Sequence, residues 1–121
     1  MSAAVRVPFN VLRPGDDRPA IEAAIARVLD SGWFVLGPEV AAFEAEFAAA
    51  AGAARAVGVN TGTDAIALAL RGLGIGAGDE VITSPLSAAY SALAIDMIGA
   101  RPVFADIDPV RLTLAPDAVA A

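Results

Sequence analysis

Apolar side chains recur at helical spacing over residues 19–32. Pro19 is tolerated in the first turn of a helix, and Gly32 is a common stop at a helix end. One face of the predicted helix carries apolar side chains, at Ile21, Ile25, Val28 and Leu29. Prolines and a glycine interrupt the preceding segment, so residues 1–17 are predicted to form an extended arm with turns.

A second helix is predicted after a loop over residues 32–37. Pro38 suits the first turn of this helix, and Gly52 suits its end. Its apolar positions again recur at helical spacing, at Val40, Phe43 and Phe47.

Three short apolar runs follow, at residues 56–59, 81–83 and 102–105, and each fits a buried strand. Helical patterns over residues 65–70 and 87–98 separate these runs. The predicted order is therefore helix, helix, strand, helix, strand, helix, strand. Strands that are joined by single helices pair in parallel, so the chain is predicted to be an α/β protein with a parallel sheet.

The last residues, 110–121, include a Pro116-Asp117 pair that is typical of the start of another helix. Three parallel strands with so few helices would leave sheet edges and part of one face uncovered. We therefore expect residues 18–121 to be an incomplete N-terminal part of a larger domain, preceded by the arm over residues 1–17.

The charge balance is acidic, with a net charge of -6, and the eight basic residues are all arginines. Those arginines are scattered along the chain, whereas nucleic-acid binding requires a basic face, so a nucleic-acid partner is not expected. The sequence contains neither histidine nor cysteine. Metal ligation and catalysis through imidazole or thiolate groups are therefore excluded.

Hydrophobic residues make up 57% of the sequence, which raises the question of a membrane segment. A spanning helix needs ~20 consecutive apolar residues. The charge-free stretch at residues 81–95 is shorter and is interrupted by a proline and several hydroxyl side chains. We expect no membrane span and no secretory signal, and a chain without cysteine suits a cytoplasmic location.

The turn over residues 60–64 (NTGTD) carries the first candidate chemistry. It lies between a predicted strand and a predicted helix, and its glycine permits close approach of a ligand to the backbone. Free N–H groups and the helix dipole suit a phosphate at this position. An ordinary helix cap by Thr or Asp explains the same residues, and the spacing alone leaves both interpretations open.

Two other candidate sites have simpler structural explanations. Gly72, Gly74 and Ala77 match a dinucleotide fingerprint, but a helix precedes them and a strand follows, the reverse of the required order. We interpret residues 72–78 as a turn. Asp106 and Asp108 could bind a metal or act as an acid–base pair, and a solvated Asp-Pro turn is favoured.

The loop at Trp33 and Phe34 has two readings that the sequence leaves open. The two aromatic side chains could line a pocket, or they could pack as part of a hydrophobic loop.

Four stretches together resemble the fold-type-I sugar aminotransferases of the DegT/DnrJ/StrS group. They are SGWFVLGPEV at 31–40, GVNTGTDA at 58–65, GAGDEVI at 76–82 and GARPVFADIDP at 99–109. Their order and spacing match as well, and the resemblance extends over nearly the whole chain, from about Val7 onward.

The resemblance implies part of the three-layer large domain of fold-type-I transferases, with pyridoxal phosphate (PLP) as cofactor. Thr61, Gly62 and Thr63 are implied to bind the PLP phosphate. In many relatives an aromatic residue stacks on the PLP ring at the position that Ala88 occupies here, and Tyr90 lies on a different helix face.

The same resemblance implies that Trp33, Phe34 and Gly37 belong to the substrate mouth. The implied reaction transfers an amino group, typically from glutamate, to a nucleotide-linked keto sugar. Enzymes of this group usually form homodimers that share active sites between subunits.

The chain contains no lysine. PLP chemistry needs a lysine that binds the cofactor covalently and moves protons, and arginine is a poor substitute because it stays protonated. We therefore expect this chain alone to be inactive, with no catalytic residue of its own. The alternatives are a non-catalytic module or remnant that binds a phosphate-bearing ligand or pairs with a lysine-bearing chain, and a nucleotide-binding α/β domain.

Overall fold

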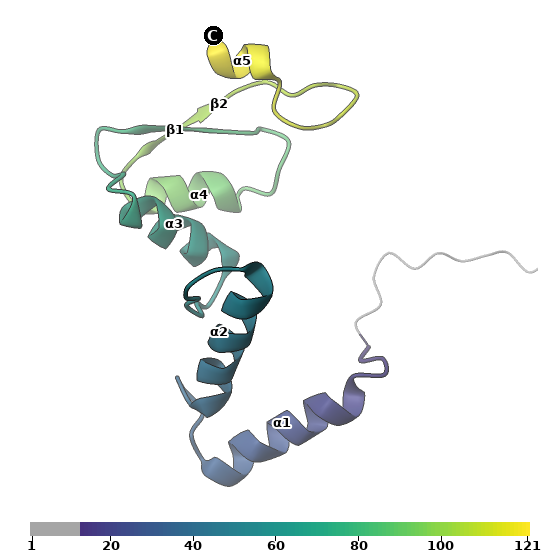
Figure 1. Ribbon diagram of the computed structural model, residues 1–121. Helices are drawn as coiled ribbons and strands as arrows, with labels where there is room; N and C mark the ends of the chain where they lie inside the picture. Colours follow the sequence, from purple (N-terminus) through teal and green to yellow (C-terminus); the bar gives the residue numbers. More distant parts are fainter. Residues whose placement is uncertain (1–12) are drawn as a thin grey trace, which may run out of the picture. The chain divides into compact units, whose positions relative to one another are not determined.

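The computed structural model describes residues 13–121, and the first twelve residues of the predicted arm lie outside this range (Figure 1). The described chain forms two compact units, of which the first ends at Gly58 and the second begins at Val59. The first unit contains two helices, and the second contains three helices and two strands. Each unit is described separately.

The first unit consists of α1 (Arg18–Ser31) and α2 (Pro38–Ala51), which confirms both predicted helices. Each helix has a proline in its first turn and is followed by a left-handed glycine, Gly32 with φ 64° and Gly52 with φ 65°. A glycine adopts this backbone conformation without a steric penalty, so each helix can end at its glycine.

The second unit is built around two parallel strands, β1 (Glu80–Thr83) and β2 (Arg101–Phe104). Glu80 is paired with Arg101 and Thr83 with Phe104, and the side chains of Glu80 and Arg101 also form an ion pair. α3 (Gly62–Gly72) leads into β1, and α4 (Tyr90–Met97) connects the two strands. A short α5 (Pro116–Ala120) completes the described chain and confirms the predicted helix start at Pro116.

Small side chains form the core of the second unit. Three alanines and two isoleucines from α3, α4 and the segment before β2 cluster there: Ala67, Ala94, Ile95, Ile98 and Ala100. Alanine lets the backbones of α3 and α4 approach closely, and Leu70, Ile75 and Val81 pack around the cluster. The core is thus small in volume and depends on the two isoleucines for most of its buried apolar area.

The α/β class and the parallel pairing are confirmed, but the prediction of a strand at residues 56–59 was wrong. The described sheet has two strands, and residues 56–59 have no regular secondary structure. A strand exists only where a neighbour accepts and donates its backbone bonds. Here the Gly58 N–H donates instead to Oε1 of Glu44 at 2.7 Å, and the side chain of Val57 is 79% exposed.

The helix predicted over residues 87–98 is shorter than expected, because α4 begins at Tyr90. The chain bends at residues 85–87, and the Leu86 N–H donates to the Ser84 hydroxyl at 3.1 Å. This local bond competes with helix formation.

The predicted Asp-Pro turn is confirmed. Asp108 accepts hydrogen bonds from the N–H groups of Val110 and Arg111, each at 2.8 Å. These two backbone donors hold the pKa of the Asp108 carboxyl below its usual value. The Asp106 carboxylate accepts the N–H of Ile107, so both carboxylates are used by the backbone of the turn.

Within residues 13–121, none of the helices combines the length and the apolar character that crossing a bilayer would require.

Candidate functional site

The N-terminus of α3 holds the residues that the sequence predicts for phosphate binding. Thr61 precedes the helix in an extended conformation, with φ −144° and ψ 160°. Its carbonyl accepts the N–H of Ala65 at 3.0 Å, which closes the first helical turn. Its hydroxyl accepts the N–H of Asp64 at 3.1 Å, so Thr61 is the N-cap of α3.

Asp64 returns this interaction from the first turn. The Thr61 hydroxyl donates to Oδ2 of Asp64 at 3.0 Å, which makes the pair reciprocal. The arrangement is related to a capping box, in which a residue three positions after the cap bonds back to it. The cap interpretation of Thr61 is therefore confirmed, and the carboxylate of Asp64 lies within the same turn as the candidate phosphate donors.

Gly62 and Thr63 provide the remaining donors at this helix start. Within the described residues, neither of their N–H groups has a hydrogen-bond partner, as is usual for the first turn of a helix. A Cβ added to Gly62 would meet no heavy atom within 4 Å, so the space at its side-chain position is open. Two free N–H groups, the Thr63 hydroxyl, the helix dipole and an open approach together fit a phosphate group.

The position of this turn in the second unit also suits a ligand. Figure 1 shows that α3 and α4 both begin on the side of the unit where β1 ends. Ligands of open parallel sheets bind beyond the carboxyl ends of the strands. The candidate donors therefore lie at the ligand-binding end of the fold.

Ala88 lies in the turn that precedes α4 and is exposed. Its side chain is a single methyl group, and no hydrogen bond joins it to residues 61–63 in the described chain. Tyr90, two residues later, begins α4 and is 64% exposed. Within the described residues, no contact holds Ala88 or Tyr90 in a position to stack on the ring of a bound cofactor.

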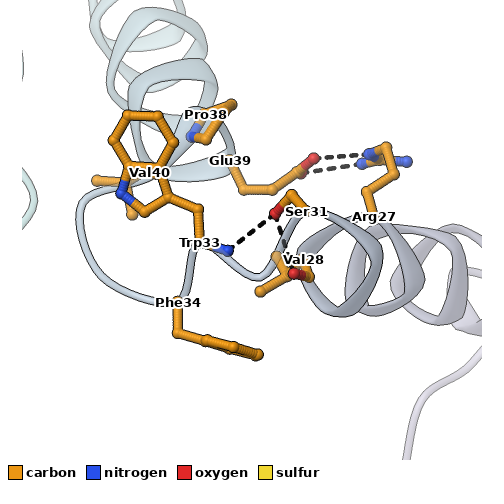
Figure 2. Close-up of a pocket in the computed structure, with 9 residues that line it drawn as sticks. Arg27, Val28, Ser31, Trp33, Phe34, Pro38, Glu39 and Val40 are labelled. Atoms are coloured by element: carbon orange, nitrogen blue, oxygen red, sulfur yellow. Dashed lines mark hydrogen bonds and ion pairs between the residues drawn. The ribbon is translucent and has the colours of Figure 1, made fainter.

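A separate cavity of about 270 Å³ lies in the first unit, where the loop between α1 and α2 turns (Figure 2). All three predicted substrate-pocket residues, Trp33, Phe34 and Gly37, contribute to its wall. The N–H of Trp33 donates to the Ser31 hydroxyl at 3.1 Å, and the indole Nε1–H donates to the Val35 carbonyl at 2.7 Å. The indole is therefore fixed by its own loop, whereas the Phe34 side chain is 67% exposed.

An ion pair between α1 and α2 closes one side of this cavity. Nε and Nη2 of Arg27 contact Oε1 and Oε2 of Glu39 at 2.6 and 2.9 Å, a bidentate geometry (Figure 2). The hydrogen bonds raise the pKa of Arg27 and lower the pKa of Glu39. Both side chains are well exposed, so solvent screens the pair and it contributes more to geometry than to stability.

Gly37 is buried at the start of α2, directly against Trp33. A Cβ at this position would lie 2.9 Å from the Trp33 carbonyl oxygen and 3.3 Å from Cγ of the indole. The loop therefore has its observed shape only with glycine at this position.

We expect Gly37→Ala to displace the Trp33 loop and to destabilise the chain by roughly 1–3 kcal/mol, as overpacking does. Urea unfolding measures the loss, and the emission of Trp33, the single tryptophan, reports the displacement. Gly72→Ala is the matched control, because a Cβ there meets nothing within 4 Å. Equal unfolding midpoints and unchanged emission for both variants would contradict the close packing of Gly37.

Sequence reasoning missed the participation of Arg27 and Glu39. A helix cap by Thr or Asp was expected at residues 61–64, and the Thr-x-x-Asp spacing there is a recognisable capping signal. Arg27 and Glu39 are twelve positions apart in two different helices, and no local pattern relates them.

Comparison with known proteins identifies a family for nearly all of the described chain. The model of the DegT/DnrJ/EryC1/StrS aminotransferase family matches residues 16–121. The chain is 53% identical over 92 residues to the spore coat polysaccharide biosynthesis protein SpsC of Bacillus subtilis (strain 168), a match that covers 76% of this chain and 24% of SpsC. It is 52% identical over 100 residues to dTDP-3-amino-3,4,6-trideoxy-alpha-D-glucose transaminase of Streptomyces venezuelae, covering 81% of this chain and 26% of that enzyme.

A similar fold is found in the crystal structure of NtdA from Bacillus subtilis, solved with the bound cofactor PMP. The TM-score is 0.85 at 30% identity, and the match covers 96% of this chain and 27% of NtdA. Such neighbours are fold-type-I PLP aminotransferases, as the sequence resemblance implied. The chain spans about a quarter of the length of the curated relatives that it matches.

Proposed function

The chain belongs to the DegT/DnrJ/EryC1/StrS aminotransferase family, and from this membership we propose that it supplies the cofactor-phosphate site and part of the substrate pocket of a PLP-dependent sugar aminotransferase. In this proposal residues 18–121 are the N-terminal part of the PLP-binding large domain. The family relationship supports the reaction class, and the geometry of the α3 N-terminus supports the role of these residues within it.

One observation carries the proposal: an open helix start with two unpaired N–H groups lies where the family resemblance requires a phosphate site. Gly62 has no side chain to fill the space in front of α3, and Thr63 adds a hydroxyl group next to it. A phosphate placed there accepts from both N–H groups and is stabilised by the dipole of an eleven-residue helix.

PLP, when bound, supplies the electron sink that allows an amino group to be transferred. In our proposal the residues of this chain bind and orient that cofactor through its phosphate. Thr61 fixes the backbone of the turn, while Gly62 and Thr63 provide the donors. Ala88 is assigned to the cofactor site because it occupies the position of the aromatic residue that stacks on the PLP ring in many relatives, and its methyl group cannot replace that stacking.

The proposed substrate is a nucleotide-linked keto sugar, with glutamate as the typical amino donor. Support comes from the Streptomyces venezuelae relative, whose name specifies the transamination of a dTDP-linked sugar, and from SpsC, which is named for polysaccharide biosynthesis. We place Trp33, Phe34 and Gly37 in the wall of the substrate pocket, and we propose a homodimer as the active assembly. The ion pair between Arg27 and Glu39 would hold that wall in shape.

The proposal separates binding from catalysis in these 121 residues. Because the chain has no lysine, no side-chain amine can hold PLP covalently or move the proton during transfer. The missing lysine also supports an alternative function, that of a non-catalytic module that binds a phosphate-bearing ligand.

We expect the purified chain to show no transamination when it is supplied with PLP, glutamate and a dTDP-linked keto sugar. Amino-sugar product is measured by mass spectrometry, with a lysine-containing sugar aminotransferase of the family as the positive control. Turnover above the rate with PLP alone would contradict the proposal that this chain alone is inactive.

A further inference from the structure

We propose that Asp64 is a positioning residue of the phosphate site, which holds the hydroxyl proton of Thr61 and so removes Thr61 from the donors available to the cofactor. This inference rests on the proposed function, because it concerns how the α3 turn binds a phosphate. It restricts the direct phosphate donors to the N–H groups of Gly62 and Thr63 and to the Thr63 hydroxyl.

The hydrogen bonds of Thr61 leave its hydroxyl without a free proton. A threonine hydroxyl has one proton to donate, and here it is directed to Oδ2 of Asp64 at 3.0 Å. The hydroxyl oxygen of Thr61 also accepts the N–H of Asp64 at 3.1 Å, which fixes the rotation of the Thr61 side chain. Thr61 could bond to a phosphate only by breaking its bond to a carboxylate, which is itself a charge-assisted acceptor.

The charge of Asp64 acts on the same turn. A carboxylate in the first turn of a helix interacts favourably with the dipole, as a phosphate does. The two negative groups therefore compete for the same positive helix end, and each repels the other. Asp64 stabilises the turn in the absence of cofactor and lowers its affinity for phosphate when the cofactor binds.

Substitutions at the two threonines separate the roles that we assign. Thr61→Val removes the hydroxyl group that bonds to Asp64 and introduces no other donor. Thr63→Val removes a hydroxyl from the first turn and retains the shape of the side chain. The probe is pyridoxamine phosphate, because it binds without a covalent bond to lysine, and its dissociation constant is measured by isothermal titration calorimetry.

We expect Thr61→Val to leave the affinity for pyridoxamine phosphate within about twofold, and Thr63→Val to weaken it about tenfold, the usual effect of losing a hydrogen bond to a charged group. A loss of affinity in Thr61→Val as large as in Thr63→Val would overturn the inference, because it would make Thr61 a direct donor.

Two variants of Asp64 test the charge and the hydroxyl bond separately. Asp64→Asn removes the charge and keeps an acceptor oxygen, and it should tighten binding about threefold, the effect of two unit charges about 6 Å apart in water. Asp64→Ala also frees the Thr61 proton, so it should bind a further three- to tenfold more tightly. That further gain should vanish when Thr61→Val is combined with Asp64→Ala, because valine has no hydroxyl proton to donate. Equal affinities of wild type, Asp64→Asn and Asp64→Ala would overturn the inference.

Failure of the inference is distinguishable from failure of the proposed function. If the wild type binds pyridoxamine phosphate and Thr63→Val weakens it, the phosphate site stands whatever Asp64 does. If neither the wild type nor Asp64→Ala binds the probe, the proposed function and the inference are both overturned. A ligand-free measurement supports or refutes the bond itself, because Thr61→Val and Asp64→Ala should have non-additive effects on the urea midpoint.

Discussion

Gly62→Val is expected to weaken the binding of pyridoxamine phosphate tenfold or more while the chain keeps its fold. The Gly62 backbone is at the first position of α3, and a Cβ built there contacts no heavy atom within 4 Å. A Cβ at this position therefore meets no other atom of the protein. In our proposal the valine side chain hinders the approach of a phosphate to the N–H groups of Gly62 and Thr63.

The measurement is calorimetric titration of the variant, with circular dichroism to verify that its helix content is unchanged. Gly72→Val is the matched control, because Gly72 lies at the other end of α3 and also has nothing within 4 Å of an added Cβ. The control should bind as the wild type does. Equal affinities for the two variants would show that the start of α3 is not the phosphate site.

Ile95→Ala is expected to destabilise the chain by about 2–5 kcal/mol, the range seen when a large buried aliphatic side chain is truncated. Ile95 is 2% exposed and is one of only two isoleucines in a core cluster otherwise made of alanine. The alanine side chains of the cluster are too small to fill the cavity that the substitution would create. The loss should therefore be in the upper part of this range.

Urea unfolding followed by circular dichroism measures this loss. Leu93→Ala is the control in the same helix, because Leu93 is 49% exposed and should cost much less. If the two substitutions shifted the unfolding midpoint equally, the assignment of the core to the contact of α3 with α4 would be wrong.

The helices of the first unit were predictable because their ends are encoded locally. Pro19 and Pro38 suit first turns, and Gly32 and Gly52 adopt the left-handed conformation that ends a helix. None of these signals depends on distant parts of the chain. The parallel pairing of β1 and β2 was predictable for a similar reason, since a single helix connects them.

The strand expected at residues 56–59 shows the limit of local reasoning. A short apolar run fits a strand, but pairing requires a neighbour, and this run forms no ladder with β1 or β2. Gly58 bonds instead to a side chain of α2, Glu44, fourteen residues away. A hydrogen bond between residues so far apart in the sequence cannot be predicted from a periodic pattern of side chains.

The candidate site was also predictable only in part. The helix start at residues 61–64 was recognisable from a glycine flanked by threonines, and the cap and the proposed phosphate site involve different residues of one turn. Thr61 is the cap, and Gly62 and Thr63 have the free N–H groups. The ion pair beside Trp33 was not predictable, because it depends on the angle at which two helices meet.

An NMR titration of the labelled chain with pyridoxamine phosphate tests the central claim most directly. The account predicts that the amide resonances of Gly62 and Thr63 shift most and saturate together with the phosphorus signal of the ligand. Absence of binding, or shifts centred on the glycine turn at residues 72–78, would contradict the assignment of the cofactor-phosphate site to the start of α3.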